Sequence, residues 1–183
     1  MLEDSFECRC ILCHDHGDRD QADGVDLRII DHVRQYGWHV VMVVDDDVRF
    51  AYTIGLSHSH GAPELAMFGL DVYEMNRMLN TLGAKAAAGT ELKDGLRDDD
   101  VIEGRPVALR AVDPAWHRTF FGRARGFYRG QTPLTVLQVA WPDADHHFHW
   151  EDQARERDRG RQPQLWLTPE EHPAGMWTAD AGN

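Results

Sequence analysis

The amino-acid sequence predicts an α+β domain built on a mainly antiparallel β-sheet. Two β-prone runs, residues 38–44 and 48–56, are separated by a polar turn at 45–47, which is typical of an antiparallel pair. Residues 25–36 and 71–88 instead carry apolar residues at spacings of three and four, which predicts two amphipathic helices. Because the strands do not alternate strictly with helices, the order indicates the α+β class.

Five strands in all are expected, and with tight turns between them they could curl into a small split barrel. Two or three helices would flank this sheet, and a Trp-rich, irregular tail would follow Pro142. The remaining predicted elements are strands at 64–70, 105–112 and 134–141, a helix at 114–128 broken at Gly122 and Gly126, and loops at 57–63 and 93–104.

The length and charge of the chain limit its organisation and its partners. The 183 residues suit one domain at 25–183, preceded by a Cys/His-rich arm or metal knuckle at 1–24. A formal net charge of −12 argues against nucleic acid and anionic membranes as partners. The acidic N-terminus lacks the features of a signal peptide, and no apolar run approaches the roughly 20 residues that span a bilayer. We therefore expect a cytoplasmic protein.

A metal site is predicted at the N-terminal cysteines. Cys8, Cys10 and Cys13 offer thiolates, which are soft ligands for zinc or copper, and His16 could complete a tetrahedron. A histidine from elsewhere in the chain would serve equally well. Four protein ligands would leave no open position, so such a site would be structural zinc. The alternatives are an arm with free thiols and a Cys-x-Cys redox pair. A second histidine group, at 146–149, is either a transition-metal site or part of a surface strand.

The segment between the second and third predicted strands carries a candidate catalytic set. His58 lies in this loop and Glu64 follows it, and a carboxylate there could act as a general base or tune the pKa of a histidine. The alternative is a solvated turn shaped by Gly61 and Pro63, in which Glu64 bonds loop amides. The candidate catalytic residues are Tyr52, His58, Glu64 and His117.

The stretch from Arg105 to Arg129 is basic within an acidic chain, with six arginines and only Asp113 as an acid. Guanidinium groups suit phosphate or carboxylate, so this stretch could hold a small anion or the phosphate of a flavin. Internal pairing with the acidic excess elsewhere is the alternative. Trp141 either contacts a ligand through its aromatic ring or packs the irregular C-terminal tail against the core. The candidate cofactor-binding residues are Arg118, Arg123, Arg125, Arg129 and Trp141.

Several short motifs carry a family resemblance. Tyr-Thr-Ile-Gly-Leu at 52–56 and Pro-Glu-Leu at 63–65 are the most specific, and the Cys spacing and Trp-Pro-Asp at 141–143 agree with them. On these motifs the chain resembles the bacterial family catalogued as domain of unknown function 4262, in its longer actinobacterial form. One departure is the His-rich run at 146–150, where this family is expected to have a Gly-x-Phe-Pro-Trp-like run. The resemblance implies a shared fold over nearly the whole chain and no established activity.

Three classes of function remain open on the sequence alone. The first is a ligand-binding domain with a zinc site at its N-terminus and a pocket between the 58–64 loop and the 118–129 helix. The second is an enzyme that uses a flavin or other phosphate-bearing cofactor, or a metal held by His58 or His60 with Glu64 as base. The third is a module whose acidic surface and Trp-rich tail bind a partner protein.

Overall fold

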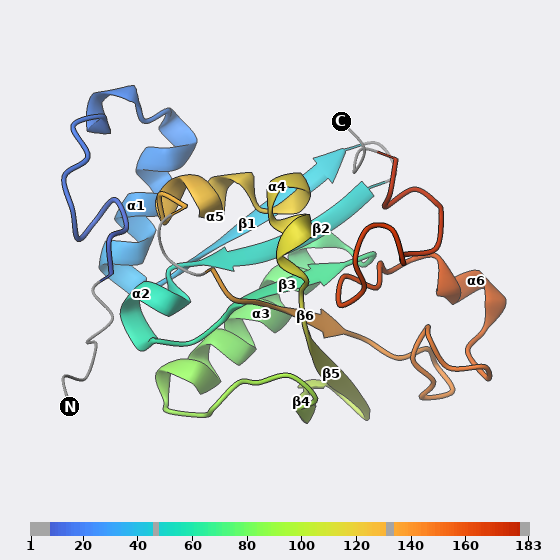
Figure 1. Ribbon diagram of the computed structural model, residues 1–183. Coiled ribbons are helices and arrows are strands. Elements are labelled where there is room, and N and C mark those ends of the chain that lie inside the picture. The colour runs from blue at the N-terminus through green and yellow to red at the C-terminus, as the bar shows by residue number, and fades with distance from the viewer. Residues whose placement is uncertain (1–7, 46–47, 131–133, 180–183) are drawn as a thin grey trace, which may run out of the picture.

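The computed structural model describes residues 8–45, 48–130 and 134–179, which form one sheet with helices on both faces (Figure 1). Among these residues the sheet has six strands in the order β1-β2-β3-β6-β5-β4. Neighbouring strands are antiparallel, except that β3 and β6 are parallel. The strands are β1(His39–Asp45), β2(Val48–Ile54), β3(Glu64–Phe68), β4(Arg97–Ile102), β5(Arg105–Ala111) and β6(Val136–Ala140).

The α+β prediction is confirmed, whereas the split barrel is not. In the described chain β1 and β4 are the two outer strands of the sheet, and they do not pair with each other. Each strand is short, five to seven residues, and the sheet stays open because helices rather than a second set of strands cover its two faces.

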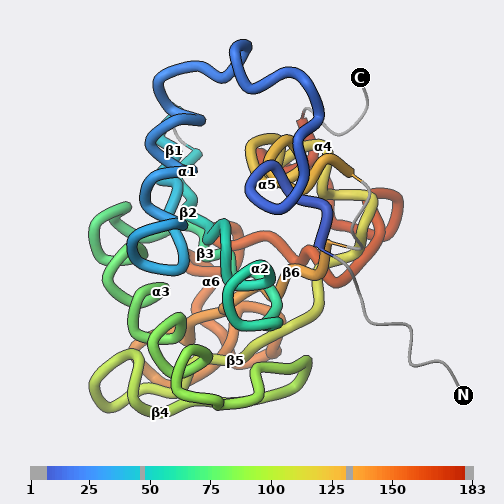
Figure 2. Tube along the Cα trace, turned by 90° about the vertical axis from the view of Figure 1, so that its left-hand side faces the viewer, coloured from blue at the N-terminus to red at the C-terminus, as the bar shows by residue number. Residues whose placement is uncertain are grey.

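The two faces of the sheet carry different hydrophobic cores. Side chains alternate between faces along a strand, so Leu65 and Met67 of β3 pack with Met75 and Leu79 of α3, while Phe68 faces the opposite side. That opposite core is aromatic and is covered by α1, α4 and α5. Figure 2 shows these helices separated from α3 by the sheet. The helices are α1(Gly24–Tyr36), α2(Leu56–His60), α3(Val72–Ala87), α4(His117–Phe120), α5(Gly122–Phe127) and α6(Glu156–Arg159).

Both predicted amphipathic helices are confirmed, and aspartate caps define their starts. The Asp23 carboxylate accepts from the backbone N–H groups of Val25 and Asp26, and Asp26 returns the bond in a capping box. The Asp71 carboxylate caps α3 by accepting from the N–H groups of residues 73 and 74. The buried face of α1 is shorter than its apolar spacing predicts, because Val25 and Tyr36 at the two ends of the helix are exposed.

Two predicted loops are wrong. Residues 57–63 were expected to be irregular, but residues 56–60 form helix α2, which Gly55 introduces with a φ of 114°. Residues 93–104 were expected to be a surface loop, but 97–102 form the outer strand β4. Its sequence, Arg-Asp-Asp-Asp-Val-Ile, has low β-propensity, and pairing with β5 rather than local preference makes it a strand. Of the turn at 45–47, residues 46 and 47 lie outside the described residues.

The predicted helix at 114–128 is divided into three short pieces. A 3-10 turn at Pro114–Trp116 leads into α4, and Phe121, with a φ of −117°, separates α4 from α5. The break therefore falls at Phe121, one residue before the predicted Gly122, which is the first residue of α5, whereas Gly126 lies inside α5. Both pieces bury aromatic rings against the sheet, which keeps α5 next to the N-terminal arm.

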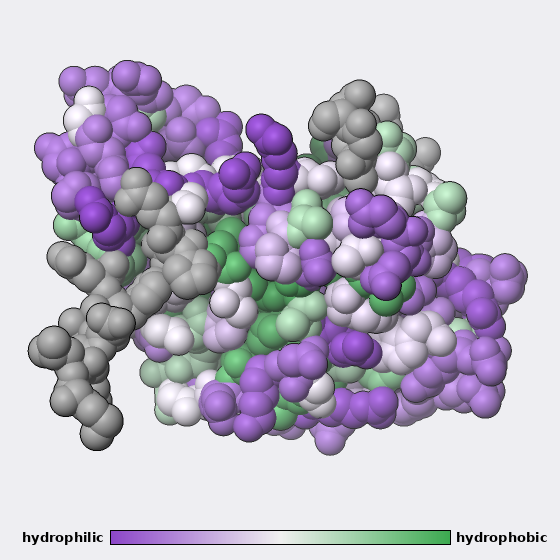
Figure 3. Space-filling model, viewed as in Figure 1, coloured by the Kyte–Doolittle hydropathy of each residue, from purple (hydrophilic) through white to green (hydrophobic). Residues whose placement is uncertain are grey.

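The described part of the N-terminal arm and the C-terminal tail both pack on the body of the domain. Cys10 and Ile11 are buried in the aromatic core, and the Ile11 N–H donates to the Phe127 carbonyl at 2.9 Å. The tail contributes Trp177 to the same core. Figure 3 shows hydrophilic side chains over the arm and α1 and over the tail, with a hydrophobic strip between them. No described helix is long and apolar enough to cross a membrane.

Candidate metal centre

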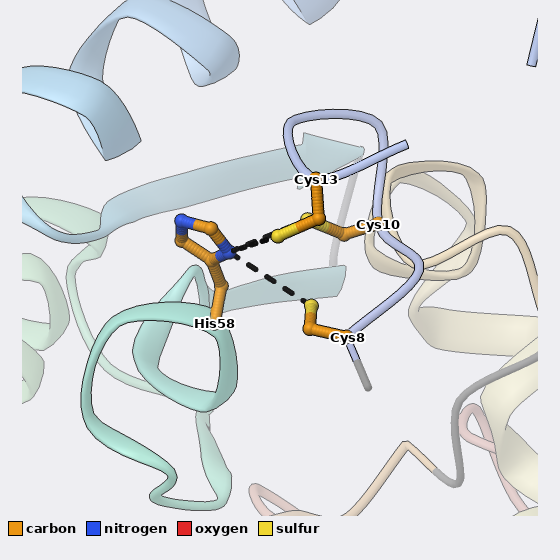
Figure 4. A group of neighbouring side chains, drawn as sticks. All are labelled: Cys8, Cys10, Cys13 and His58. Atoms are coloured by element: carbon orange, nitrogen blue, oxygen red, sulfur yellow. Dashed lines mark hydrogen bonds between the residues drawn. The ribbon is translucent and has the colours of Figure 1, made fainter. Parts of the chain in front are cut away.

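Three cysteines of the arm meet one histidine of α2. The Sγ atoms of Cys10 and Cys13 lie 3.4 Å from Nδ1 of His58, and Sγ of Cys8 lies 3.8 Å from the same atom (Figure 4). All four candidate ligand atoms lie within 4.8 Å of one another. A tetrahedral zinc ion with Zn–S of about 2.3 Å and Zn–N of about 2.0 Å would place sulfur and nitrogen about 3.5 Å apart. The observed distances therefore bracket the separation that a bound zinc ion requires.

Three sulfur atoms around one ring nitrogen cannot be explained by hydrogen bonding alone. A neutral imidazole nitrogen has either one proton or one lone pair, so it forms one good hydrogen bond, and thiols are weak donors and acceptors. A metal ion at the centre of the four atoms would use all of them at once. Among the cysteine, histidine, aspartate and glutamate side chains that the structure describes, these four form the group whose ligand atoms lie close enough together to hold a metal ion.

The cysteine loop is shaped by a tight turn of the backbone. The N–H groups of Cys13 and His14 both donate to the Cys10 carbonyl, at 3.1 and 3.0 Å, so the chain folds back on itself between Cys10 and Cys13. Burial raises the pKa of the Cys10 thiol to about 12, although backbone N–H groups of Leu12 and Cys13 oppose this shift. A thiol must lose its proton to bind a metal, so the positive charge of the ion would stabilise the buried thiolate.

Helix α2 presents His58 because a buried carboxylate holds its first turn. Glu64 is 1% exposed, and its Oε1 accepts hydrogen bonds from the N–H groups of Gly55 and Ser57 at 3.0 and 3.1 Å. Its Oε2 accepts from the Thr53 hydroxyl at 2.6 Å. Tyr128 also donates its hydroxyl proton to Oε1. Burial, and next the charge of Glu64, raise the pKa of Tyr128, so this hydroxyl stays protonated and remains a donor.

The ring of His58 is suited to metal binding in its neutral form. Burial lowers its pKa, which favours the imidazole with a free lone pair over the imidazolium. The ring lies edge-on to Phe127, with 6.5 Å between centroids, and Phe127 also accepts the arm's backbone bond from Ile11. Helix α5 therefore touches both halves of the cluster.

The structure keeps the three predicted cysteines together but replaces the predicted histidine. His16 is not in the cluster, since its Nε2 lies 2.9 Å from the carbonyl oxygen of Arg9. The distant histidine left open by the sequence is His58, which is separated from Cys10 by 48 positions. Sequence reasoning named His58 as a catalytic candidate and as a possible ligand of a separate catalytic metal, but did not assign it to the cysteine site. No local pattern could pair it with the cysteines, because the chain returns to them only through α1, β1 and β2.

The four predicted catalytic residues do not form one site. Both oxygens of Glu64 are taken up by the donors described above, and His58 points towards the cysteines. Tyr52 is a core residue stacked on Phe50, with burial raising its pKa to about 12. His117 is half-buried beside Phe121, and its Nε2 has no hydrogen-bond partner among the described residues.

The predicted arginines and Trp141 are likewise separated. Arg123 bonds the carboxylates of Asp23 and Asp26 at 2.7 and 2.8 Å, and Arg129 bonds Asp18 at 2.7 Å. Internal pairing with acidic residues is therefore what the structure shows for these two. They line a cavity of about 310 Å³ between the arm, α1 and α5, which no residue of 58–64 lines. Arg118 and Arg125 are exposed, whereas Trp141 is buried on the wall of a different cavity.

The fold and the cluster together define an α+β domain with a candidate Cys₃His metal centre. A family model, that of the domain of unknown function (DUF4262), matches residues 32–155. The chain belongs to this family. The matched region contains His58 but begins after the three cysteines. No curated protein and no solved structure matches the chain.

Proposed function

We propose that this chain is a ligand-binding domain stabilised by a structural zinc ion bound to Cys8, Cys10, Cys13 and His58. The observation that supports a bound metal ion is the placement of three Sγ atoms at 3.4 to 3.8 Å from a single ring nitrogen. Thiolate and imidazole ligands in a tetrahedral arrangement are those that zinc prefers in proteins. With all four positions filled by the protein, a metal ion here has no open position for a substrate, which supports a structural role.

A zinc ion at this position would act as a cross-link between distant segments. Three ligands come from the arm and the fourth from α2, so the ion closes a loop of roughly 50 residues that contains α1, β1 and β2. It would hold the arm over the aromatic core, where Cys10 and Ile11 are buried. Three ligand thiols also require a reducing environment, and a cytoplasmic location is part of the proposal.

Binding rather than catalysis is supported by the state of Glu64. As a general base it would need a free oxygen directed at a substrate, but its two oxygens accept four hydrogen bonds from protein groups. The net charge of −12 supports small molecules over nucleic acid or anionic membranes as binding partners.

Elemental analysis of the native protein tests the proposal. We expect one zinc ion per chain in protein purified without chelator. Cys10→Ser and His58→Ala should each lose the ion, whereas His60→Ala and His16→Ala should keep it. His60 is a matched control because it lies on the same short helix, two residues from His58. A native protein without metal, or a metal content unchanged by Cys10→Ser, would contradict the proposal.

A further inference from the structure

We propose that a cavity at the carboxyl ends of β3 and β6 binds a small organic anion, an apolar molecule that carries a carboxylate or phosphate group. The inference rests on the ligand-binding role proposed above and is independent of the metal. The cavity has a volume of about 480 Å³, within the range of small-molecule sites. Leu70, two residues after β3, and Trp141, the residue after β6, both line it.

The position of the cavity relative to the sheet is the first argument. In open α/β sheets, ligands bind in the crevice beyond the carboxyl ends of the parallel strands. The cavity of this mixed sheet lies at the corresponding end of its one described parallel pair. Strands β3 and β6 are the parallel pair of the described sheet, with Glu64 opposite Val136 and Ala66 opposite Gln138. Because they run in the same direction, the turns that follow both strands leave the sheet at the same edge (Figure 1).

Charge is the second argument. Arg77, Arg105 and Arg161 line the cavity, and neither Arg77 nor Arg105 forms an ion pair within the described residues. This differs from the cavity beside α5, whose two arginines are bonded to aspartates. Glu74 and Glu103 also lie on the lining, and Arg161 forms an ion pair with Asp158 at 3.3 Å, so Arg77 and Arg105 are the arginines of this lining that have no carboxylate partner among the described residues. Guanidinium groups without carboxylate partners are available to bind an anion.

A second, smaller cavity adjoins the first. It has a volume of about 270 Å³ and shares Leu70 and Arg161 with the first, so the two meet at Arg161. Arg49 adds a fourth guanidinium there. The carboxylate of Asp71, also on this lining, is occupied by the first N–H groups of α3.

The apolar wall of the larger cavity is held in place by hydrogen bonds to the backbone and side chain of Trp141. The Trp141 indole N–H donates to the Phe68 carbonyl at 2.8 Å, and Gln162 bonds both the N–H and the carbonyl of Trp141. The Arg161 guanidinium lies 4.8 Å from the Trp141 ring centroid and donates to the Gly69 carbonyl at 2.9 Å. Fixed groups lose little conformational entropy on binding, so this wall favours a flat apolar body beside Arg161.

The close approach of residue 161 depends on a glycine. Gly69 has a φ of 81°, and a Cβ at this position would lie 2.0 Å from the carbonyl oxygen of Arg161. Only glycine therefore lets the turn after β3 lie against the chain segment that carries Arg161. This contact places the guanidinium between the two cavities.

A fluorescence titration of the full chain with 8-anilinonaphthalene-1-sulfonate tests the inference, because this probe combines an apolar body with one anionic group. The double variant Arg77→Gln/Arg105→Gln should weaken binding about tenfold or more, since charge-assisted hydrogen bonds are lost. Glu74→Gln/Glu103→Gln should tighten it about threefold, since a like charge is removed. Arg34→Gln, an exposed change on α1, should leave the affinity unchanged.

Competition by inorganic phosphate and by benzoate distinguishes the two kinds of anionic group, and displacement of the probe by at least one of them is expected. The inference is overturned if the wild-type chain does not bind the probe, or if the Arg77/Arg105 variant binds it as tightly as the Arg34 variant does. The glutamate variant keeps the test decisive if the arginine variant fails to fold, because an unchanged affinity there also contradicts the inference. Zinc content should be the same in all these variants, so failure of the metal proposal is seen separately.

Discussion

The Tyr128 hydroxyl donates a hydrogen bond to the Glu64 carboxylate, and this buried contact joins α5 to the turn that begins α2. The same hydroxyl accepts from the Gly55 N–H at 3.0 Å. Helix α5 contacts the arm through Phe127, and α2 carries His58. One buried pair therefore connects the elements that carry both halves of the candidate metal centre, as outer groups around metal sites commonly do.

Replacing Tyr128 by Phe should weaken both the fold and the metal site. The change removes one of four donors to a buried carboxylate and leaves the Gly55 N–H with a single acceptor, which costs about 1–3 kcal/mol in the free energy of unfolding. Metal affinity should fall about tenfold, because His58 is held less firmly. Chemical denaturation and a chelator competition measure the two effects. Tyr73→Phe, at an exposed position, is the control, and equal values for the two variants would contradict this role.

Substituting Gly55 by Ala should destabilise the protein through a steric clash. A Cβ there would lie 2.7 Å from the Gly37 carbonyl oxygen and 3.0 Å from Cα of Trp38. Gly89→Ala is a matched control, because Gly89 also has a positive φ, 94°, but faces open space. We expect a loss of about 1 kcal/mol at position 89, from backbone strain alone, and about 3 kcal/mol at position 55. Urea unfolding measures the difference, and similar losses would show that the turn adapts.

Removing the metal should loosen the arm while the sheet remains folded. A cross-link that closes a loop of roughly 50 residues stabilises a chain by about 4 kcal/mol in the loop-entropy treatment. After chelation we expect faster hydrogen exchange at the Ile11 amide and in α2, and little change in β3 and β6. Mass spectrometry of exchanged peptides measures this pattern. Protection of residues 8–14 that is unchanged by chelation would show that packing alone holds the arm.

His149 should make the stability of the protein fall in mild acid. It is 4% exposed, and neither ring nitrogen has a well-aligned hydrogen-bond partner among the described residues. Burial lowers its pKa to about 4, against a smaller opposing effect from the Pro163 backbone. Between pH 6.5 and 4 the unfolded chain binds a proton here that the folded chain does not, so the free energy of unfolding decreases as the pH falls, by up to about 3 kcal/mol.

His149→Phe should remove this part of the pH dependence and leave the rest. Urea unfolding at pH 7 and pH 5 measures the slope in the wild-type chain, in this variant and in His146→Asn, a change at an exposed neighbouring position. A slope as steep in His149→Phe as in the control would show that other groups cause the acid sensitivity.

Elements with a strong local signal were predicted well. Helices α1 and α3 follow from apolar spacing and aspartate caps, and β1 and β2 from their β-branched and aromatic residues. The failures have non-local causes. Strand β4 is charged and is a strand only through its pairing with β5. Helix α2 is a single turn whose N–H groups depend on Glu64, a residue beyond its own end.

By itself the sequence determined the fold class and three of the four candidate metal ligands, because apolar periodicity and the spacing of Cys8, Cys10 and Cys13 are local properties. Only the tertiary structure decided whether His16 or His58 is the fourth candidate metal ligand. It also decided that Arg123 and Arg129, near α5, pair with aspartates of the arm and α1. These choices depend on which surfaces the packed helices bring together, since the partners lie between 45 and 111 positions apart. At such separations the physical neighbours of a side chain are set by the sheet order and the two cores, and no local pattern records them.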